Sequence, residues 1–292
     1  MLKKITLGTA GLGGTWHPVD LGQSVDAIVY ALEKGITHID MAPAYMDAEI
    51  VVGQALKKWK GKDLFLSTKV GKRRGIATQK GLIDYEVSSL KTSLERSLER
   101  LNREYVDLLF MHEPDQIPIA SIPAVIDVFL SFKDQGLAKK MGMGGKPPKP
   151  IVPYIEKGYF DVVMDFNGYN LVERQASIAD FPFYRKHKLE IYEGSPLMMG
   201  LLGSRLDAYT KKRPSWIPKK SIQLANEMQS LASKWNMDLS TMAHRFLLGN
   251  TDIDRLVIGP ANFSQLRATM SDLELGRLEN DLLKEINSLL NL

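Results

Sequence analysis

Short apolar runs alternate with amphipathic stretches along almost the whole chain of 292 residues. The runs have the length and apolar content of buried strands, and turn-forming residues often bound them. They lie at residues 5–10, 37–40, 64–70, 106–111, 140–144, 162–165, 189–192 and 255–258. Helical stretches fall between them. The pattern therefore predicts eight strands in alternation with helices.

The helical stretches have recognisable periods and ends. The stretch 87–101 places leucine at helical spacing, at Leu90, Leu94, Leu98 and Leu101. The stretch 24–34 stops at Gly35, a frequent residue at helix C-termini. Asp47 is a candidate N-cap for the helix that follows it. The final stretch, 274–292, predicts one more helix after the last unit.

Eight strand–helix units favour a closed α/β barrel of the (β/α)8 type with an added C-terminal helix. An open doubly wound sheet shows the same alternation, so periodicity alone leaves that alternative open. Such a barrel typically has about 250 residues, which suits this length. No linker interrupts the pattern, because the proline-rich segment 147–150 is short enough for a loop. We expect a single domain over residues 1–292.

The composition narrows the classes of function. Lysine and arginine (38) exceed aspartate and glutamate (34) by only four, too few to indicate a nucleic-acid partner. Cysteine is absent, which excludes disulfides and thiol catalysis. The five histidines are scattered, and we predict no metal site. We see neither a signal peptide nor an apolar run near the roughly 18 residues of a membrane span, so we expect a cytoplasmic protein without membrane contact.

Three successive predicted strands end on groups that can transfer or tune protons. The first delivers Asp40 and is followed by Tyr45, the second ends near Lys69 and the third ends at His112. In a parallel barrel the carboxyl ends of the strands meet at one mouth, where active sites lie. We therefore expect these four side chains to form one catalytic site.

The chemistry of this set is acid–base chemistry. A free tyrosine has a pKa of about 10, and a nearby ammonium such as that of Lys69 should favour the phenolate. Asp40 could neutralise and hold Lys69, and His112 could orient a substrate oxygen toward Tyr45. Because no nucleophile is evident, a bound nicotinamide would have to carry the hydride. An alternative is a barrel lyase in which Lys69 forms a Schiff base.

Four segments carry a resemblance to a known family. Gly-Ile-Thr-His-Ile-Asp-Met-Ala-Pro-Ala-Tyr (35–45), Leu-Ser-Thr-Lys-Val (66–70), Val-Asp-Leu-Leu-Phe-Met-His (106–112) and the helix-into-strand segment 97–107 resemble the aldo-keto reductases. The resemblance runs over nearly the whole chain. It implies a barrel oxidoreductase that binds NADP or NAD without a Rossmann domain. It also implies that Asp40, Tyr45, Lys69 and His112 form the catalytic tetrad, with Tyr45 as the acid–base residue.

Two later segments, 160–170 and 194–202, are similar to the sugar 1-dehydrogenases of this family, which oxidise an aldose to its lactone. We therefore expect a small carbonyl or sugar substrate and a monomer or small homo-oligomer. Two alternatives within the resemblance stay open. One is a general aldehyde reductase, and the other is a regulatory protein that binds the cofactor with little turnover.

The resemblance also implies a set of binding residues. The cofactor would contact Thr9, Asp40, Gly144, Asn167, Ser195, Leu197, Gly200, Leu201, Gly259, Ala261 and Gln265. Backbone N–H groups of the loop at 195–201 could hold a phosphate. Trp16, Tyr45 and His112 would contact the substrate, and Trp16 would form one wall of its pocket.

Three positions depart from the family pattern. Gly144–Gly145 replaces a serine–asparagine pair that holds the carboxamide, and Gly194 replaces an aromatic residue that stacks on nicotinamide. Gln265 replaces an arginine that meets the 2′-phosphate of NADP, although Arg267 lies close by in sequence. A glutamine cannot neutralise a phosphate. We therefore expect both NAD and NADP to bind, without strong discrimination.

Overall fold

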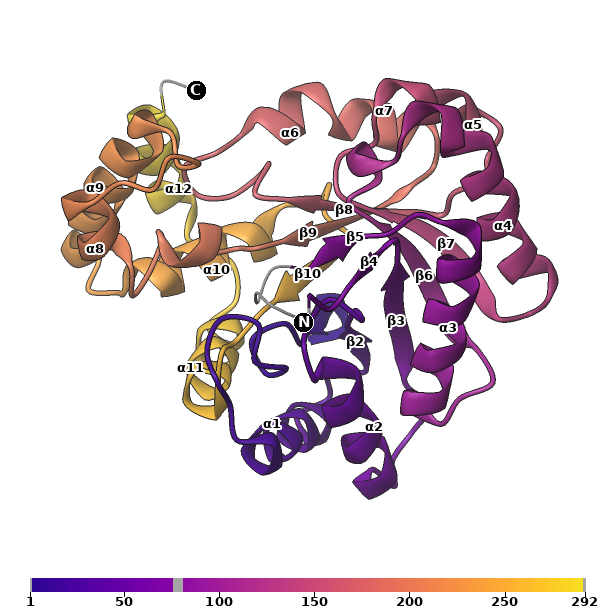
Figure 1. The fold of residues 1–292 in the computed structure, drawn as a ribbon. Coiled ribbons are helices and arrows are strands. Elements are labelled where there is room, and N and C mark those ends of the chain that lie inside the picture. The colour runs from indigo at the N-terminus through magenta and orange to yellow at the C-terminus, as the bar shows by residue number, and fades with distance from the viewer. Residues whose placement is uncertain (1, 76–80, 291–292) are drawn as a thin grey trace.

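Eight parallel strands close into a barrel in the computed structural model, which describes residues 2–75 and 81–290 (Figure 1). The strands are β1 (Ile5–Gly8), β2 (His38–Asp40), β3 (Phe65–Val70), β6 (Val106–His112), β7 (Ala138–Gly144), β8 (Val162–Phe166), β9 (Glu190–Gly194) and β10 (Arg255–Ile258). Around the barrel they follow the order β1-β10-β9-β8-β7-β6-β3-β2. The pairing of β1 with β10 closes the ring, so the predicted barrel is confirmed and the open sheet is excluded.

Helices surround the barrel. They are α1 (Leu21–Glu33), α2 (Ala48–Lys58), α3 (Val87–Leu101), α4 (Ile122–Asp134), α5 (Val152–Glu156), α6 (Gln175–Ala179), α7 (Phe181–Lys186), α8 (Leu206–Lys211), α9 (Lys219–Lys234), α10 (Leu239–Gly249), α11 (Phe263–Glu274) and α12 (Asn280–Leu289). Short 3₁₀ helices cover Leu2–Lys4, Pro114–Gln116, Ile119–Ser121, Lys149–Ile151 and Met198–Gly200. Three helices, α8 to α10, separate β9 from β10. Helix α9 contacts both α8 and α12, and this group stands to one side of the barrel (Figure 1).

Local details differ from the sequence prediction at three places. Asp47 precedes α2 but makes no capping bond, because its carboxylate accepts from Arg74 instead, at 2.8 Å. The predicted C-terminal helix is confirmed as α12, but it begins at Asn280 rather than at 274, because Gly276, at φ 77°, separates it from α11; residues 291–292 lie outside the described residues. A small antiparallel pair, β4 (Lys72–Arg73) with β5 (Leu82–Ile83), was not predicted.

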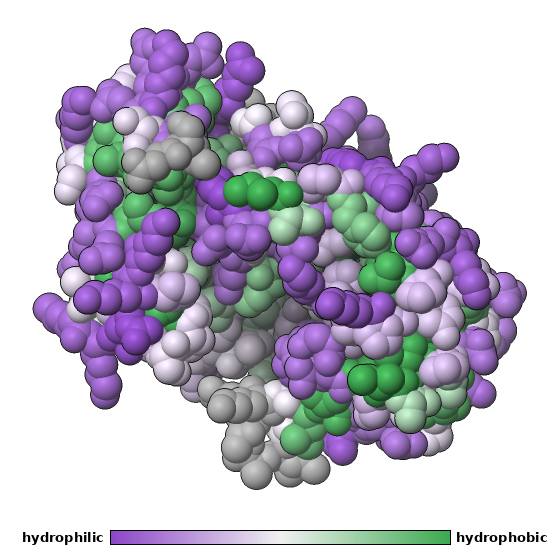
Figure 2. Space-filling model, turned by 90° about the horizontal axis from the view of Figure 1, so that it is seen from above, coloured by the Kyte–Doolittle hydropathy of each residue, from purple (hydrophilic) through white to green (hydrophobic). Residues whose placement is uncertain are grey.

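The core has two layers. Inside the barrel, seven apolar side chains fill the lumen: Phe65, Leu108, Phe110, Val162, Met164, Tyr192 and Val257. A larger layer lies between the strands and the helices. Full burial of one such side chain contributes about 1.5–3 kcal/mol. The lumen is therefore packed, and ligands must bind at the barrel's mouth. The face shown in Figure 2 is hollowed near its centre, with pale to green side chains inside and purple ones around it.

Three aspartates fix the register at the amino ends of the strands. Asp107, Asp161 and Asp254 each lie at or just before the start of a strand. Their carboxylates accept hydrogen bonds from the backbone N–H of the adjacent strand, at Leu66 (2.9 Å), Met141 (2.8 Å) and Ile191 (2.7 Å). A bond to a charged acceptor contributes roughly 1.5–3 kcal/mol. These bonds fix how neighbouring strands are aligned at the amino end of the barrel, which is opposite the mouth where the carboxyl ends meet.

His38, at the start of β2, has a structural role and gives a testable pH dependence. Its ring stacks on Phe65 with centroids 4.5 Å apart. Burial, and then the charge of Arg255, lower the pKa of His38 to about 4. The unfolded chain takes up this proton near pH 6.5, so the stability that the neutral ring contributes is present above about pH 6.5 and is lost as the pH falls toward 4.

We expect a His38→Gln variant to lose less thermal stability than the parent protein between pH 7 and about pH 4.5. Thermal unfolding followed by circular dichroism at both pH values measures the difference. An equal loss in the two proteins would show that His38 does not contribute to acid sensitivity.

Within the described ranges, no helix combines the length and the apolar character that crossing a bilayer requires.

Candidate active site

A buried ion pair forms the base of the site. Lys69, near the end of β3, donates to Asp40 at the end of β2 (2.6 Å) and to the carbonyl oxygen of Met41 (3.1 Å). Ser67 donates to the same carboxylate at 2.8 Å. Asp40 and Lys69 are only 2% and 1% exposed. Such a buried pair persists because hydrogen bonds satisfy its members, and their positions are accordingly fixed.

Thr9 supports this pair from behind. Its hydroxyl and its backbone N–H both donate to the carbonyl oxygen of Asp40, at 2.9 and 3.0 Å. Thr9 has no exposed surface. Sequence reasoning placed Thr9 against the cofactor, whereas the structure places it against the backbone of Asp40.

Tyr45 stands over the ion pair on the turn after β2. The Nζ atom of Lys69 lies 5.0 Å from the centroid of its ring. The ring of His112, at the end of β6, meets Tyr45 edge to face at a centroid distance of 5.5 Å. The barrel thus brings the four predicted side chains together.

The pKa of Tyr45 is raised well above 10, by burial first and then by the negative charges of Asp40 and Glu113. In the free protein, burial and these carboxylates therefore outweigh the favourable effect of Lys69 on the phenolate. The physical reason is that Asp40 neutralises Lys69 at 2.6 Å, while the phenol itself is poorly solvated. Tyr45 thus holds its proton at neutral pH and is a proton donor in this state.

His112 is neutral at physiological pH. Burial, and then the charges of Lys69 and Lys72, lower the pKa of His112 well below 6.5. Its Nδ1 atom has no hydrogen-bond partner among the described residues. Its carbonyl oxygen accepts from the hydroxyl of Tyr85 at 2.7 Å, which fixes the backbone. A neutral imidazole carries one N–H and can donate to a substrate oxygen.

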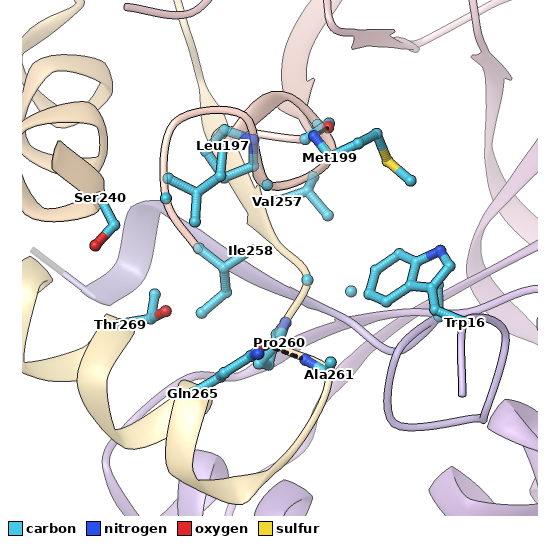
Figure 3. Close-up of a pocket in the computed structure, with 18 of the residues that line it drawn as sticks. Trp16, Leu197, Met199, Ser240, Val257, Ile258, Pro260, Ala261, Gln265 and Thr269 are labelled. Carbon is cyan, nitrogen blue, oxygen red and sulfur yellow. Dashed lines mark hydrogen bonds between the residues drawn. The ribbon is translucent and has the colours of Figure 1, made fainter. Parts of the chain in front are cut away.

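A cavity of about 380 Å³ has Tyr45 in its lining. Figure 3 shows other residues that line this cavity. Its walls come from the carboxyl ends of β1, β2, β8, β9 and β10, and from α10 and α11. Trp16 lies at one end, and Ser240 and Thr269 lie at the other (Figure 3). The cavity is therefore elongated.

Most residues predicted to bind cofactor or substrate line this cavity. The lining includes Trp16, Asp40, Tyr45, Ser195, Leu197, Gly200, Gly259, Ala261 and Gln265. It does not include Thr9, Lys69, His112, Gly144, Asn167 and Leu201. Lys69 is buried in its ion pair and has no free path to a carbonyl substrate, which argues against a Schiff-base lyase.

The glycines that depart from the family pattern lie beside residues of the site, where an added Cβ atom would touch its neighbours. A Cβ atom at Gly144 would lie 3.2 Å from the carbonyl oxygen of Met111 and 3.7 Å from Lys69. A Cβ atom at Gly194 would lie 3.7 Å from the ring of Phe166, which is 57% exposed and lines the cavity. Asn167 follows Phe166 and has a buried side-chain oxygen without a partner among the described residues.

The loop after β9 is unusually shaped. Ser195, Met198 and Met199 all have positive φ angles (61°, 46° and 55°), each of which costs about 1–3 kcal/mol. The N–H groups of Gly200 and Leu201, which we expected to face a phosphate, donate within the loop to Leu197 (2.9 Å) and Met198 (3.1 Å).

Other N–H groups of this loop remain available. Those of Leu197, Gly203 and Ser204 donate to no other described residue, and all three residues line the cavity. The loop therefore has three unpartnered backbone donors at residues that line the cavity, but these are not the full set that we expected.

The sequence analysis did not predict three ionisable residues of the cavity: Arg205, His244 and Asp272. Arg205 contacts the hydroxyl of Tyr209 (3.1 Å) and lies 3.5 Å from His17. A basic residue directly after a predicted phosphate loop was the available signal. His244 and Asp272 lie on different helices, α10 and α11, and meet at 2.9 Å. No local pattern reveals such a pair.

Together these features describe a (β/α)8-barrel enzyme with an acid–base site at one end of an elongated cavity. The chain belongs to the aldo/keto reductase family, whose model matches residues 4–291. It is accordingly an NAD(P)-dependent oxidoreductase, and the class predicted from the sequence is confirmed.

Two curated relatives and one solved structure illustrate the likeness. The chain is 25% identical to the NADH-specific methylglyoxal reductase of Escherichia coli (strain K12), over 96% of this chain and 92% of the relative. It is 24% identical to the L-galactose dehydrogenase of Arabidopsis thaliana, over 98% and 90%. The structure of a glycerol dehydrogenase from Gluconobacter oxydans superposes with a TM-score of 0.79, at 24% identity over 98% and 91%, which shows the shared fold.

Proposed function

We propose that this protein interconverts a small carbonyl compound and its alcohol, with Tyr45 transferring the proton to or from the substrate oxygen. The observation that carries the proposal is the cluster of Tyr45, His112 and the Lys69–Asp40 pair at one end of the cavity. When bound, the nicotinamide ring supplies or accepts the hydride.

The residues of the cavity fit a nicotinamide dinucleotide. Arg205 and the free N–H groups of Leu197 and Ser204 suit a diphosphate. Asn167 does not line the cavity, but it follows Phe166, which does, and its unpartnered side-chain oxygen suits the amide of the carboxamide. The ring of Trp16 offers an apolar wall.

The roles of the catalytic side chains follow from their protonation states. In the reductive direction Tyr45, which holds its proton, donates to the developing alkoxide. Neutral His112 donates a hydrogen bond to the same oxygen and orients it. In the oxidative direction the phenolate of Tyr45 must form and accept the proton. The fixed charge of Lys69 stabilises that phenolate as it forms.

For the substrate, we propose an aldose that is oxidised at its anomeric carbon to the lactone. The similarity of segments 160–170 and 194–202 to sugar 1-dehydrogenases supports this, as does the L-galactose dehydrogenase among the relatives. Reduction of a small aldehyde is the second candidate, favoured by the methylglyoxal reductase relative. We also propose a cytoplasmic location and a monomer or small homo-oligomer, on the sequence grounds given above.

The test compares catalytic efficiency for free aldoses with NAD or NADP against simple and aromatic aldehydes with NADH or NADPH. Absorbance of the reduced nicotinamide reports both directions. We expect measurable oxidation of at least one aldose. If no aldose is oxidised while aldehydes are reduced well, the sugar assignment is wrong and the aldehyde reductase stands.

The pH dependence provides an independent check on Tyr45. Because its pKa lies well above 10 in the free protein, the phenolate fraction keeps growing with pH through the alkaline range. We expect the oxidation rate to rise with pH up to at least about 10, and the reduction rate to stay nearly level near neutrality. An oxidation rate that levels off near pH 7 would identify a different base.

A further inference from the structure

Polar residues of α10 and α11 line the end of the cavity far from Tyr45. The backbone at Tyr45 packs against the loop that carries Trp16: the backbone N–H of Asp47 donates to the carbonyl oxygen of Gly13 at 3.0 Å, and a Cβ atom at Gly13 would collide with the carbonyl oxygen of Tyr45. Figure 3 places Trp16 opposite Ser240 of α10 and Thr269 of α11. A dinucleotide with its nicotinamide at Tyr45 would therefore place its adenosine between α10 and α11. This step rests on the proposed function.

A carboxylate lines this far end. Asp272 of α11 accepts hydrogen bonds from the hydroxyl of Thr241 (2.6 Å) and from His244 of α10 (2.9 Å). His244 is 2% exposed, and both His244 and Asp272 line the cavity. Thr241 and His244 both lie on α10, so their two bonds hold the carboxylate in one position.

No described lysine or arginine lies at this end to balance a phosphate, and the ring of His244 is already bonded to Asp272. Among the described residues, Arg205 is the one lysine or arginine that lines the cavity. It reaches toward His17, on the side of the cavity that carries Trp16. Arg267 is exposed and does not contribute to the lining.

Side chains also occupy two of the N–H groups around the start of α11. The first N–H groups of a helix ordinarily attract a phosphate. Here the side chain of Asn262 accepts from the N–H of Gln265 at 2.9 Å. The side chain of Gln265 in turn accepts from the N–H of Ala261, also at 2.9 Å (Figure 3). Two donors that a phosphate could use are thus already engaged.

We infer that the α10–α11 end of the cavity selects an adenosine without a 2′-phosphate, and that Asp272 sets this preference. The enzyme accordingly binds NAD(H) in preference to NADP(H). A 2′-phosphate at this end would meet the fixed carboxylate of Asp272 and no lysine or arginine among the described residues, and two nearby N–H groups are already engaged. The carboxylate therefore repels the phosphate, and few groups compensate for this repulsion. This inference replaces the sequence-based expectation that both NAD and NADP bind without strong discrimination.

The experiment titrates the full-length protein with NADH and NADPH, and separately with adenosine 5′-monophosphate and adenosine 2′,5′-bisphosphate, using tryptophan fluorescence or calorimetry. We expect each 2′-phosphorylated ligand to bind roughly tenfold or more weakly than its counterpart. Asp272→Asn should narrow this ratio by strengthening the binding of the phosphorylated ligand. Glu274→Gln, an equal charge change on the exposed end of the same helix, should leave the ratio unchanged.

Gln265→Arg gives a second route, because Gln265 is exposed and its replacement should not prevent folding. It should strengthen NADPH binding. The inference is wrong if the parent protein binds NADPH as tightly as NADH or more tightly. It is also wrong if neither Asp272→Asn nor Gln265→Arg changes the ratio of the affinities for NADH and NADPH. If the protein binds NADH and NADPH with equal affinity and still catalyses the reaction, this inference is wrong but the proposed function stands. Failure to bind either dinucleotide would overturn the proposed function as well.

Discussion

A Tyr45→Phe variant should fold and bind its cofactor like the parent protein but lose about 10²- to 10⁴-fold in turnover. The substitution removes only the hydroxyl, and the phenol holds its proton at neutral pH, as its raised pKa shows. Without this hydroxyl, His112 is the one remaining side chain of the site that can exchange a proton with the substrate oxygen. Steady-state rates in both directions, with cofactor affinity measured separately, test this expectation.

Tyr30→Phe is the matched control. Tyr30 packs edge to face on Phe263 outside the site, and its hydroxyl bonds no other described residue. This variant should keep nearly full activity. If Tyr45→Phe folds, binds cofactor and still turns over at a near-normal rate, Tyr45 is not the acid–base residue.

A Lys69→Met variant should lose both activity and stability. Removing one partner of a buried ion pair leaves the other charge uncompensated, which typically costs about 3–5 kcal/mol in the free energy of unfolding. Asp40, at 2% exposure, is such a partner. Chemical denaturation at neutral pH measures the loss. Lys58→Met breaks the exposed pair with Asp26 and should change stability by less than about 1 kcal/mol.

A double variant separates the two roles of Lys69. Replacing Asp40 by Asn together with Lys69→Met removes both charges, so much of the lost stability should return. Activity should stay low, because no cation remains to stabilise the phenolate of Tyr45. A double variant as active as the parent protein would show that the pair only supports the fold. A double variant no more stable than Lys69→Met would show that unpaired charge is not the cause of the instability.

The features that could be predicted from the sequence are those that depend on the local pattern of apolar and polar residues. All eight barrel strands were expected, because each is a short apolar run between helical stretches. The meeting of Asp40, Lys69 and His112 was expected as well, because parallel strands end at one mouth. The antiparallel pair β4–β5 was missed, since two-residue strands carry no periodicity.

Features that depend on packing escaped prediction. The direction of the shift in the pKa of Tyr45 depends on how closely Asp40 neutralises Lys69, which only the folded geometry fixes. The contact between His244 and Asp272 joins two helices, 28 residues apart in sequence. The available N–H groups around Leu197 follow from the positive φ angles of a loop that no pattern of side chains specifies.

The bonds from Asp107, Asp161 and Asp254 to neighbouring strands have a consequence for how this protein can change. They fix the alignment of three strand pairs from the end of the barrel that carries no catalytic group. Loops at the opposite end can therefore be exchanged without shifting the strands on which Asp40, Lys69 and His112 stand. Substrate range and folding are in this way encoded at opposite ends of the molecule, which makes the barrel a suitable scaffold for grafting loops from relatives with other substrates.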